Sequence, residues 1–281
     1  MDIVDKIVVV TGAGSGIGRA LSIRFSERGA RFVVCTDLNS EDALETARLI
    51  GNKAQGCALD VSDEAAIEAL VKTIEADVGG IDIFVSNAGY GQSGGLELPT
   101  EDWMRMMNVH TWSHLAAARA VVPGMIERGG GYLFSTSSAA GLLTQIDSGA
   151  YAVSKHAAVA LAEWLAINYA DKGIGVSVLC PQAVRTNIMA NAIRKKKNPD
   201  RPKKDATKKR TTNSNQASGD GVLEPEHVAD ECLKAIEENR FLVLPHPEVG
   251  TYFQRKANDY DRWLDGMRRF KAKLGRGKEL R

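Results

Sequence analysis

Short apolar runs alternate with longer helical patterns along most of the chain. Each run is brief and mostly aliphatic or β-branched, which is typical of strands buried on both faces of a sheet. A regular alternation of strand and helix predicts an α/β protein built on one parallel sheet. We expect the strands at residues 6–10, 31–36, 54–59, 81–86, 132–136, 174–179 and 241–244.

Helical periodicity fills the intervals between these runs. Residues 100–128 indicate one long helix or a broken pair, residues 224–238 a shorter helix, and residues 249–281 a helical C-terminal extension. The helix expected at residues 150–169 is apolar on nearly every face. One face would cover the sheet, and the other needs a cover that this domain does not supply. We therefore expect a homo-oligomer, either a dimer or a tetramer.

A polar stretch at about residues 187–221 interrupts the pattern and is expected to be a mobile segment. Residues 194–210 within it carry ten basic residues against two aspartates. We favour a solvated loop, but a lid that attracts an anionic substrate or a coenzyme A thioester also fits. A nucleic-acid patch is a third interpretation, which the lack of interleaved aromatic residues weakens.

Length, charge and cysteine usage exclude several classes of protein. A chain of 281 residues fits one domain over residues 1–281, and a net charge of +1 gives no general attraction to nucleic acid. No apolar run approaches the ~20 residues of a membrane span, and no signal pattern opens the chain, so we expect a cytoplasmic location. The four cysteines are dispersed, and His110 and His114 lack a third ligand, so no metal site is expected.

Glycines follow the first strand directly. They are spaced as Thr-Gly-x-x-x-Gly-x-Gly rather than Gly-x-Gly-x-x-Gly, and a helical pattern comes next. Glycines permit a tight strand-to-helix turn and a close approach to a diphosphate, which the helix N-terminus then binds. A plain glycine turn is the alternative. The sequence therefore predicts dinucleotide contacts at Gly12, Ser15, Gly16, Ile17 and Gly18.

Polar and small residues mark the ends of the next strands. Asp37 ends the second strand, about twenty positions past the glycines, where an acidic residue meets the adenosine ribose. A carboxylate there would repel a 2′-phosphate, so Asp37 favours NAD over NADP, although it could simply begin a loop. Further contacts with the cofactor are expected from Asp60, Val61, Asn87, Ala88 and Gly89.

Tyr151 and Lys155 form a Tyr-x-x-x-Lys pair one helical turn apart. An ammonium beside a phenol favours the phenolate, so we expect the pKa of Tyr151 to fall toward neutrality. Such a tyrosine can accept a proton from an alcohol or return it. Ser137 and Ser138 lie at the end of the fifth strand, and either hydroxyl could hold the reacting oxygen.

Taken in order, these motifs resemble the short-chain dehydrogenase/reductase family, in its common single-domain form. The resemblance covers residues 6–186 densely. Two positions depart from the family pattern: Ser86 replaces the first asparagine of Asn-Asn-Ala-Gly, and Gln182 replaces the glycine of Pro-Gly. The resemblance implies a doubly wound Rossmann-type sheet of seven mainly parallel strands in the order 3-2-1-4-5-6-7, with helices on both faces.

The resemblance also implies roles for individual residues. The interval of thirteen residues to Tyr151 selects Ser138 over Ser137, and Asn108 would support a proton relay near Lys155. Lys155 would also bind the nicotinamide ribose. Residues 187–221 would form the substrate lid, and tetramers are common in the family. Further cofactor contacts are implied at Pro181, Val184 and Thr186, and substrate contacts at Ser138, Gln145 and Tyr151.

The sequence thus predicts an NAD-dependent oxidoreductase that interconverts a secondary alcohol and a ketone. Catalysis would rest on Asn108, Ser138, Tyr151 and Lys155. An epimerase or dehydratase with retained NAD is one alternative, but such proteins usually carry a larger substrate domain. A dinucleotide sensor without turnover is another, although a sensor has no need of an acid/base tyrosine.

Overall fold

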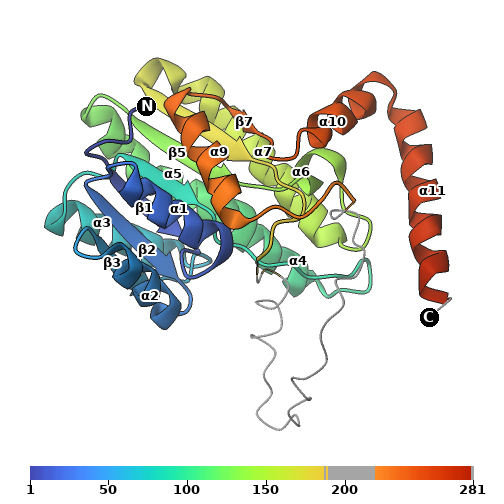
Figure 1. The fold of residues 1–281 in the computed structure, drawn as a ribbon, viewed down its shortest axis with the longest axis horizontal. Coiled ribbons are helices and arrows are strands. Elements are labelled where there is room, and N and C mark those ends of the chain that lie inside the picture. Colours follow the sequence, from blue (N-terminus) through green and yellow to red (C-terminus); the bar gives the residue numbers. More distant parts are fainter. Residues whose placement is uncertain (187, 189–218, 280–281) are drawn as a thin grey trace, which may run out of the picture.

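Seven strands form a single parallel sheet in the order β3-β2-β1-β4-β5-β6-β7 (Figure 1). The computed structural model describes residues 1–186, 188 and 219–279. The predicted strand order is confirmed, and most boundaries lie within one or two residues of those expected. The strands are β1 (Ile7–Thr11), β2 (Phe32–Asp37), β3 (Ala54–Ala58), β4 (Ile83–Ser86), β5 (Gly131–Thr136), β6 (Ile174–Leu179) and β7 (Leu242–Val243).

Helices connect the strands and cover both faces of the sheet. They are α1 (Gly16–Glu27), α2 (Ser40–Ile50), α3 (Glu64–Asp77), α4 (Thr100–Met107), η1 (Asn108–Trp112), α5 (Ser113–Glu127), α6 (Ala140–Leu143), α7 (Gly149–Tyr169), η2 (Ala170–Lys172), α9 (Pro225–Glu237), α10 (Glu248–Asn258) and α11 (Tyr260–Glu279). The predicted basic stretch at residues 194–210, and most of the predicted lid, lie outside the described residues.

Two apolar cores separate the helices from the sheet. On one face, α3, α5 and α7 bury side chains such as Ile67, Val121 and Leu165 against the strands. On the other, α1 and α9 pack on each other and bury side chains such as Phe25 and Leu233. Because all strands are parallel, their carboxyl ends share one edge, and the loops that carry the candidate site meet there.

The structure adds detail to two predicted helical regions. Residues 100–128 contain a π-helical turn, η1, between α4 and α5. The C-terminal extension is divided at Asp259, whose carboxylate accepts a hydrogen bond from the Arg262 amide at 3.0 Å and so caps α11. Helix α11 stands at the side of the molecule in Figure 1. Within the described part of the chain, no helix is long and apolar enough to cross a bilayer.

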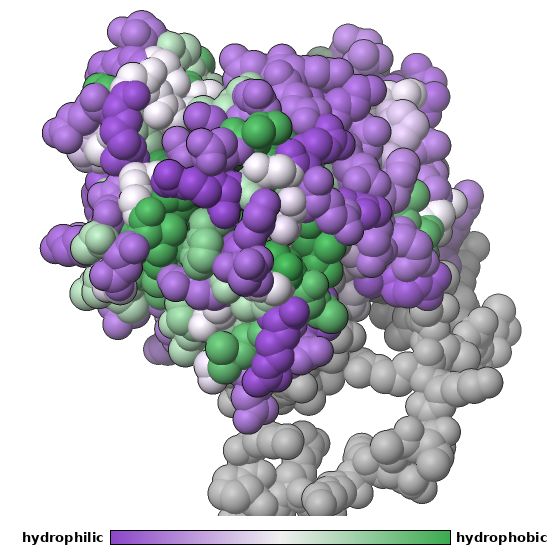
Figure 2. All heavy atoms as spheres, turned by 60° about the vertical axis from the view of Figure 1, so that its left-hand side comes forward, coloured by the Kyte–Doolittle hydropathy of each residue, from purple (hydrophilic) through white to green (hydrophobic). Residues whose placement is uncertain are grey.

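Helix α7 was expected to have one apolar face that its own domain does not cover, and several of its large apolar side chains are exposed within one chain. Val153 and Trp164 are each 51% exposed, and Ile167 is 78% exposed. Figure 2 turns the left-hand side of Figure 1 toward the reader, and hydrophobic side chains there form separate clusters among hydrophilic ones. Large apolar side chains are thus not confined to the two cores, and α7 exposes several of them.

Candidate active site

The glycine loop between β1 and α1 takes a backbone path that side chains would block. Gly12 and Gly16 have positive φ values of 65° and 54°. A Cβ atom on Gly18 would overlap the carbonyl oxygen of Gly12, and one on Gly16 would lie 2.8 Å from Cγ2 of Thr186. The tight backbone path of this loop therefore depends on glycine at these positions, and a diphosphate at the N-terminus of α1 needs such a close approach to the backbone.

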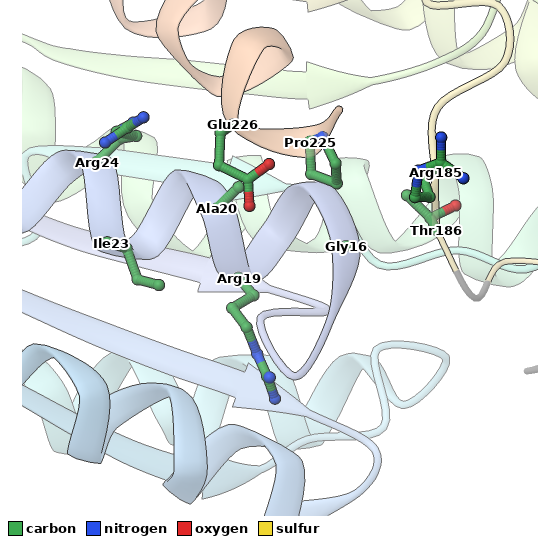
Figure 3. Close-up of a pocket in the computed structure, with 9 residues that line it drawn as sticks. All are labelled: Gly16, Arg19, Ala20, Ile23, Arg24, Arg185, Thr186, Pro225 and Glu226. Atoms are coloured by element: carbon green, nitrogen blue, oxygen red, sulfur yellow. The ribbon is translucent and has the colours of Figure 1, made fainter. Parts of the chain in front are cut away.

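A hollow of about 200 Å³ lies beside this loop (Figure 3). Gly16, Arg19 and Thr186 are among its lining residues. Arg19 turns toward α2, where its Nε donates to Oγ1 of Thr46 at 3.0 Å, and its guanidinium also donates to the Gly14 carbonyl at 2.6 Å. Arg19 thus ties the glycine loop to α2.

Asp37 lies at the end of β2, against the glycine loop. Its carboxylate accepts hydrogen bonds from the amides of Gly14 and Asn39, both at 3.0 Å. These bonds fix the carboxylate where sequence reasoning placed the contact with the adenosine ribose. Together with the glycines that a Cβ would obstruct, the position of Asp37 fits an NAD molecule along this edge.

Asn87 joins three strand ends rather than pointing freely into the site. Its Nδ2 donates to the Thr11 carbonyl at 3.0 Å, and its Oδ1 accepts from Oγ1 of Thr136 at 3.1 Å. The amides of Asn87 and Ala88 both donate to Oγ1 of Thr11. This network holds the turn that continues through Gly89, and the contact of Asn87 with a cofactor stays a prediction.

The third strand end carries Asp60 and Val61. Asp60 is exposed, and its carboxylate accepts hydrogen bonds from the amide and the hydroxyl of Ser62 at 3.0 and 2.6 Å. The Val61 side chain is buried. Both residues follow β3, so they lie at the carboxyl edge of the sheet, on the β3 side of Asn87.

The structure brings Ser138, Tyr151 and Lys155 together. Ser138 follows β5, while Tyr151 and Lys155 lie in the first two turns of α7. The Ser138 hydroxyl lies near enough to the Tyr151 phenol to favour its ionised form. The Lys155 ammonium donates to the Thr136 carbonyl at 2.9 Å and lies 5.7 Å from the centre of the Tyr151 ring. The expected trio is thus one cluster at the carboxyl edge of the sheet.

The expected fall of the Tyr151 pKa is wrong for the protein alone. Burial raises the pKa of the Tyr151 phenol above its ordinary value, and the nearby Ser138 hydroxyl opposes this only in part. Burial also lowers the pKa of Lys155 to about 8. Spacing along a helix predicted the pairing, but it carried no information on desolvation, which is the largest influence on the pKa of Tyr151.

Ser137 has a separate, structural role. Its buried hydroxyl donates to the Lys155 carbonyl at 2.9 Å, on the far side from the reacting groups. The Ser138 hydroxyl instead accepts from the Ala140 amide at 3.1 Å and reaches Tyr151. Of the two serines left open by the strand pattern, the geometry favours Ser138.

Asn108 and Gln145 are positioned by other elements than the trio. Asn108 begins η1 and lines a hollow of about 390 Å³ together with Val61 and Trp112. Gln145 lies in the loop between α6 and α7, directly after Thr144, whose φ of 84° is unusual for a β-branched residue. The relay through Asn108 and the substrate contact of Gln145 stay predictions.

Gln182 occupies the position of the glycine expected after Pro181. Its side chain donates to Asp220 at 2.7 Å, and Tyr252 of α10 donates to the same carboxylate at 3.0 Å. The Gln182 amide donates to Nδ1 of His246 at 3.2 Å. Farther on, the predicted cofactor residue Val184 forms a bridge with Leu223. Sequence reasoning missed this network. The only feature of the sequence that pointed to it was Gln182 in place of the expected glycine.

His110 is a second omission. Sequence reasoning considered it only as half of a metal pair with His114, but both rings are buried beside the trio. Burial, helped by the charge of Lys155, lowers the pKa of His114 to about 3 and that of His110 well below its ordinary value. Both imidazoles are therefore neutral near pH 7.

Comparison with known proteins identifies the family of this chain. The family model of the short chain dehydrogenases matches residues 6–197. The chain belongs to this family. The sequence predicted both this family and its Rossmann-type sheet.

Relatives agree with the family assignment over most of the chain. The 1-deoxy-11-beta-hydroxypentalenate dehydrogenase of Streptomyces exfoliatus is 34% identical over 92% of this chain and 90% of its own length. A short chain dehydrogenase/reductase from Burkholderia phymatum, solved in complex with NAD, is 30% identical with a TM-score of 0.81, covering 93% of this chain and 96% of that one. The probable oxidoreductase EphD of Mycobacterium tuberculosis is 37% identical over 66% of this chain. The matched region covers only 32% of the length of EphD.

Proposed function

We propose that this short chain dehydrogenase interconverts a secondary alcohol and a ketone with NAD as the hydride carrier. The observation that carries the proposal is the cluster of Ser138, Tyr151 and Lys155 at the sheet edge that also bears the glycine loop. The NAD in the crystal structure of the Burkholderia relative supports the choice of cofactor. Bound NAD would accept or donate the hydride.

The chain's own residues would orient the substrate and move one proton. Ser138 would hold the substrate oxygen, and Tyr151 would exchange a proton with it. Because burial raises the pKa of the phenol, Tyr151 is protonated at pH 7 in the protein alone, the form that donates a proton to a ketone. Lys155 would bind the nicotinamide ribose, and Gln145 would border the substrate.

The cofactor would lie along the edge from β2 to β6. The N-terminus of α1, with Gly12, Gly16 and Gly18, would bind the diphosphate, and Asp37 would accept hydrogen bonds from the adenosine ribose. The turn after β6 would meet the nicotinamide through its backbone. Further contacts are proposed for Ser15, Ile17, Asp60, Val61, Asn87, Ala88, Gly89, Pro181, Val184 and Thr186.

A panel of secondary alcohols and ketones, read at the nicotinamide absorbance, tests the proposal. Wild-type protein should turn over at least one compound, and the Tyr151→Phe variant should lose roughly 10²–10⁴-fold in kcat. NAD affinity should stay nearly unchanged, because the phenol contributes little to binding the dinucleotide. Tight NAD binding without turnover of any compound would favour the sensor interpretation instead.

Cofactor choice has its own test. Dissociation constants for NAD and NADP, measured by calorimetry, should favour NAD, because the carboxylate of Asp37 would repel a 2′-phosphate. The Asp37→Ala variant should narrow the difference by about tenfold. Equal affinity of the wild type for both nucleotides would contradict the assignment.

We also propose that two or four chains assemble through α7. Val153, Trp164 and Ile167 expose large apolar surface on this helix, and Met104 and Trp112 do so on α4 and η1. Light scattering at micromolar protein should give a dimer or tetramer mass. The Ile167→Glu variant should shift that mass toward the monomer, and a wild-type monomer would refute the proposal.

A further inference from the structure

His110 connects two parts of the candidate site that are far apart in sequence. It lies in the π-helical turn η1 and is 0% exposed. The backbone amide of Tyr90 donates to its Nε2 at 3.2 Å. Its Nδ1 lies 2.9 Å from Oγ of Ser154 on α7. One imidazole thus spans from the turn after Gly89 to the helix that carries Tyr151 and Lys155.

The partners of the ring determine which nitrogen carries the proton. Since Nε2 accepts a hydrogen bond from an amide, the proton resides on Nδ1, which donates to Ser154. The Ser154 hydroxyl in turn donates to the Tyr151 carbonyl at 3.0 Å. A second bond, from Thr111 to the Ser154 carbonyl at 2.9 Å, holds the same two segments together. The polar groups on both sides of the imidazole are therefore satisfied.

The imidazole also packs against the reacting groups. Its centre lies 5.5 Å from the centre of the Tyr151 ring, in an edge-on arrangement, and 5.4 Å from that of Tyr90. A Cβ atom built on Gly89 would lie 3.3 Å from Nε2 of His110 and 3.7 Å from Nζ of Lys155. The turn, the imidazole and the ammonium therefore converge at one point, behind the phenol.

Single π-helical turns occur often at functional sites, because the extra residue turns side chains that an α-helix would direct elsewhere. In η1 the turn begins at Asn108 and brings His110 and Thr111 against α7. A neutral ring suits this place, since a charged imidazole would face the Lys155 ammonium in a buried site. The ring thus acts by shape and hydrogen bonding, without exchanging a proton.

We propose that His110 is a positioning residue, a neutral brace that sets the Tyr151 phenol relative to the Asn87–Ala88–Gly89 turn and the nicotinamide beside it. The proposal rests on the proposed function, since it assumes that Tyr151 exchanges the proton. A brace of this kind affects the rate through distance, and a displacement of about 1 Å at a reacting group can cost on the order of 10²-fold.

Graded variants separate the two arms of the brace. His110→Phe keeps a ring beside Tyr151 but removes both hydrogen bonds. In His110→Gln the amide oxygen can still accept from Tyr90, and in His110→Asn the amide nitrogen can still donate to Ser154. Ser154→Ala removes one partner and leaves the histidine in place. The matched control is His156→Phe, because His156 also lies on α7 but, among the residues that the structure describes, its side chain bonds only the Ala152 carbonyl of its own helix.

The first readout divides kcat from cofactor affinity, with NAD and the most active alcohol of the panel. In His110→Phe, kcat should fall roughly 10–100-fold while the Kd for NAD, measured by calorimetry without substrate, changes less than about threefold. The Gln and Asn variants should lie between wild type and Phe, and His156→Phe should match wild type. A kcat within about twofold of wild type in His110→Phe would overturn the proposal.

The second readout needs neither cofactor nor substrate. Hydrogen exchange at the Tyr90 amide should accelerate at least about tenfold in His110→Phe and stay unchanged in Ser154→Ala. If kcat and Tm fall together and no intermediate variant recovers kcat, the role is structural only and the proposal fails. If His110→Phe does not fold, Ser154→Ala and His110→Gln decide by the same criteria. A wild type that does not turn over any alcohol refutes the proposed function before any variant is compared.

Discussion

The two sides of the candidate site are built by different physical means. On the glycine-loop side, polar groups bond to backbone near the surface, as Asp37 does with the Gly14 amide. On the α7 side, ionisable side chains lie inside the core: Lys155 is 2% exposed, His114 4% and His110 0%. The first side is costly in backbone conformation, and the second is costly in desolvation. The two sides should therefore differ in how stability responds. Substitutions of ionisable groups on the α7 side should change the dependence of stability on pH, and substitutions in the glycine loop should not.

The largest contrast should come from Lys155→Met. The folded-state pKa of Lys155 is about 8 and the unfolded value is 10.5. Between these pH values the unfolded chain binds more protons, so the stability of wild type rises with pH in this window. The variant lacks this rise. The difference in free energy of unfolding, variant minus wild type, should therefore become about 3 kcal/mol more negative between pH 8 and pH 10.5.

Urea unfolding at a series of pH values gives this difference directly. Lys172→Met is a suitable control, because Lys172 lies in η2 at the surface. The control should show a flat difference across the same range. If the difference in free energy of unfolding for Lys155→Met also does not change with pH, Lys155 is not desolvated. The contrast drawn here between the two sides of the site would then be wrong for the α7 side.

Gly18→Ala tests the other side. The added Cβ would overlap the Gly12 carbonyl and lie 2.6 Å from Nδ2 of Asn87, so backbone must move. Overpacking of this kind costs about 2–3 kcal/mol. NAD affinity should fall together with stability, because the same loop would bind the diphosphate. The loss should not change between pH 5 and pH 10, since no ionisable group is removed.

Gly51→Ala gives the contrast to Gly18→Ala, because Gly51, unlike Gly18, has a positive φ and has no atom of the described residues within 4 Å of an added Cβ. It should cost about 1 kcal/mol through backbone conformation alone and leave NAD binding intact. A Gly18→Ala variant that costs no more than Gly51→Ala and still binds NAD would show that close packing at Gly18 is not what the glycine loop requires.

His114 sharpens the contrast at acid pH. Its pKa is about 3 in the folded protein against 6.5 in the unfolded chain. As pH falls below 6.5, His114 becomes protonated in the unfolded chain but stays neutral in the folded protein, so the free energy of unfolding decreases. At pH 5 this costs about 2 kcal/mol, and His114→Leu should recover that amount relative to pH 7. Thermal unfolding at both pH values, with His156→Leu as the control, checks the prediction.

Sequence reasoning succeeded where a feature has a local signature. The order of the strands followed from the motifs of the family, and the glycines of the first loop and the Tyr151–Lys155 pair could be placed from spacing alone. These features depend on backbone geometry within one turn or one strand end. The choice of Ser138 over Ser137 came from the family resemblance, because the strand pattern alone left both serines open.

The features that were missed depend on contacts between distant segments. His110 meets Ser154 across forty-four positions, and Gln182 meets Asp220 across thirty-eight. Neither contact leaves a periodic or spaced pattern in the chain. The direction of the Tyr151 pKa was wrong for the same reason, because desolvation depends on everything that packs around a group.

Thr144 gives the smallest and finest test of the comparison. The glycine-loop side places glycine where φ is positive, but the catalytic side has a threonine at φ 84° and ψ 170°, just before Gln145. This region of conformational space is almost restricted to glycine, and a side chain held there stores about 1–3 kcal/mol. Thr144→Gly should raise the free energy of unfolding by about 1 kcal/mol after the added freedom of the unfolded chain is subtracted. Thr144→Ala keeps a Cβ and should gain much less. If Gly and Ala behave alike, the loop before Gln145 is relaxed. If only Gly stabilises, and KM for the alcohol rises with it, then the strain at Thr144 holds Gln145 toward the substrate, and the catalytic side is costly in backbone conformation as well as in desolvation.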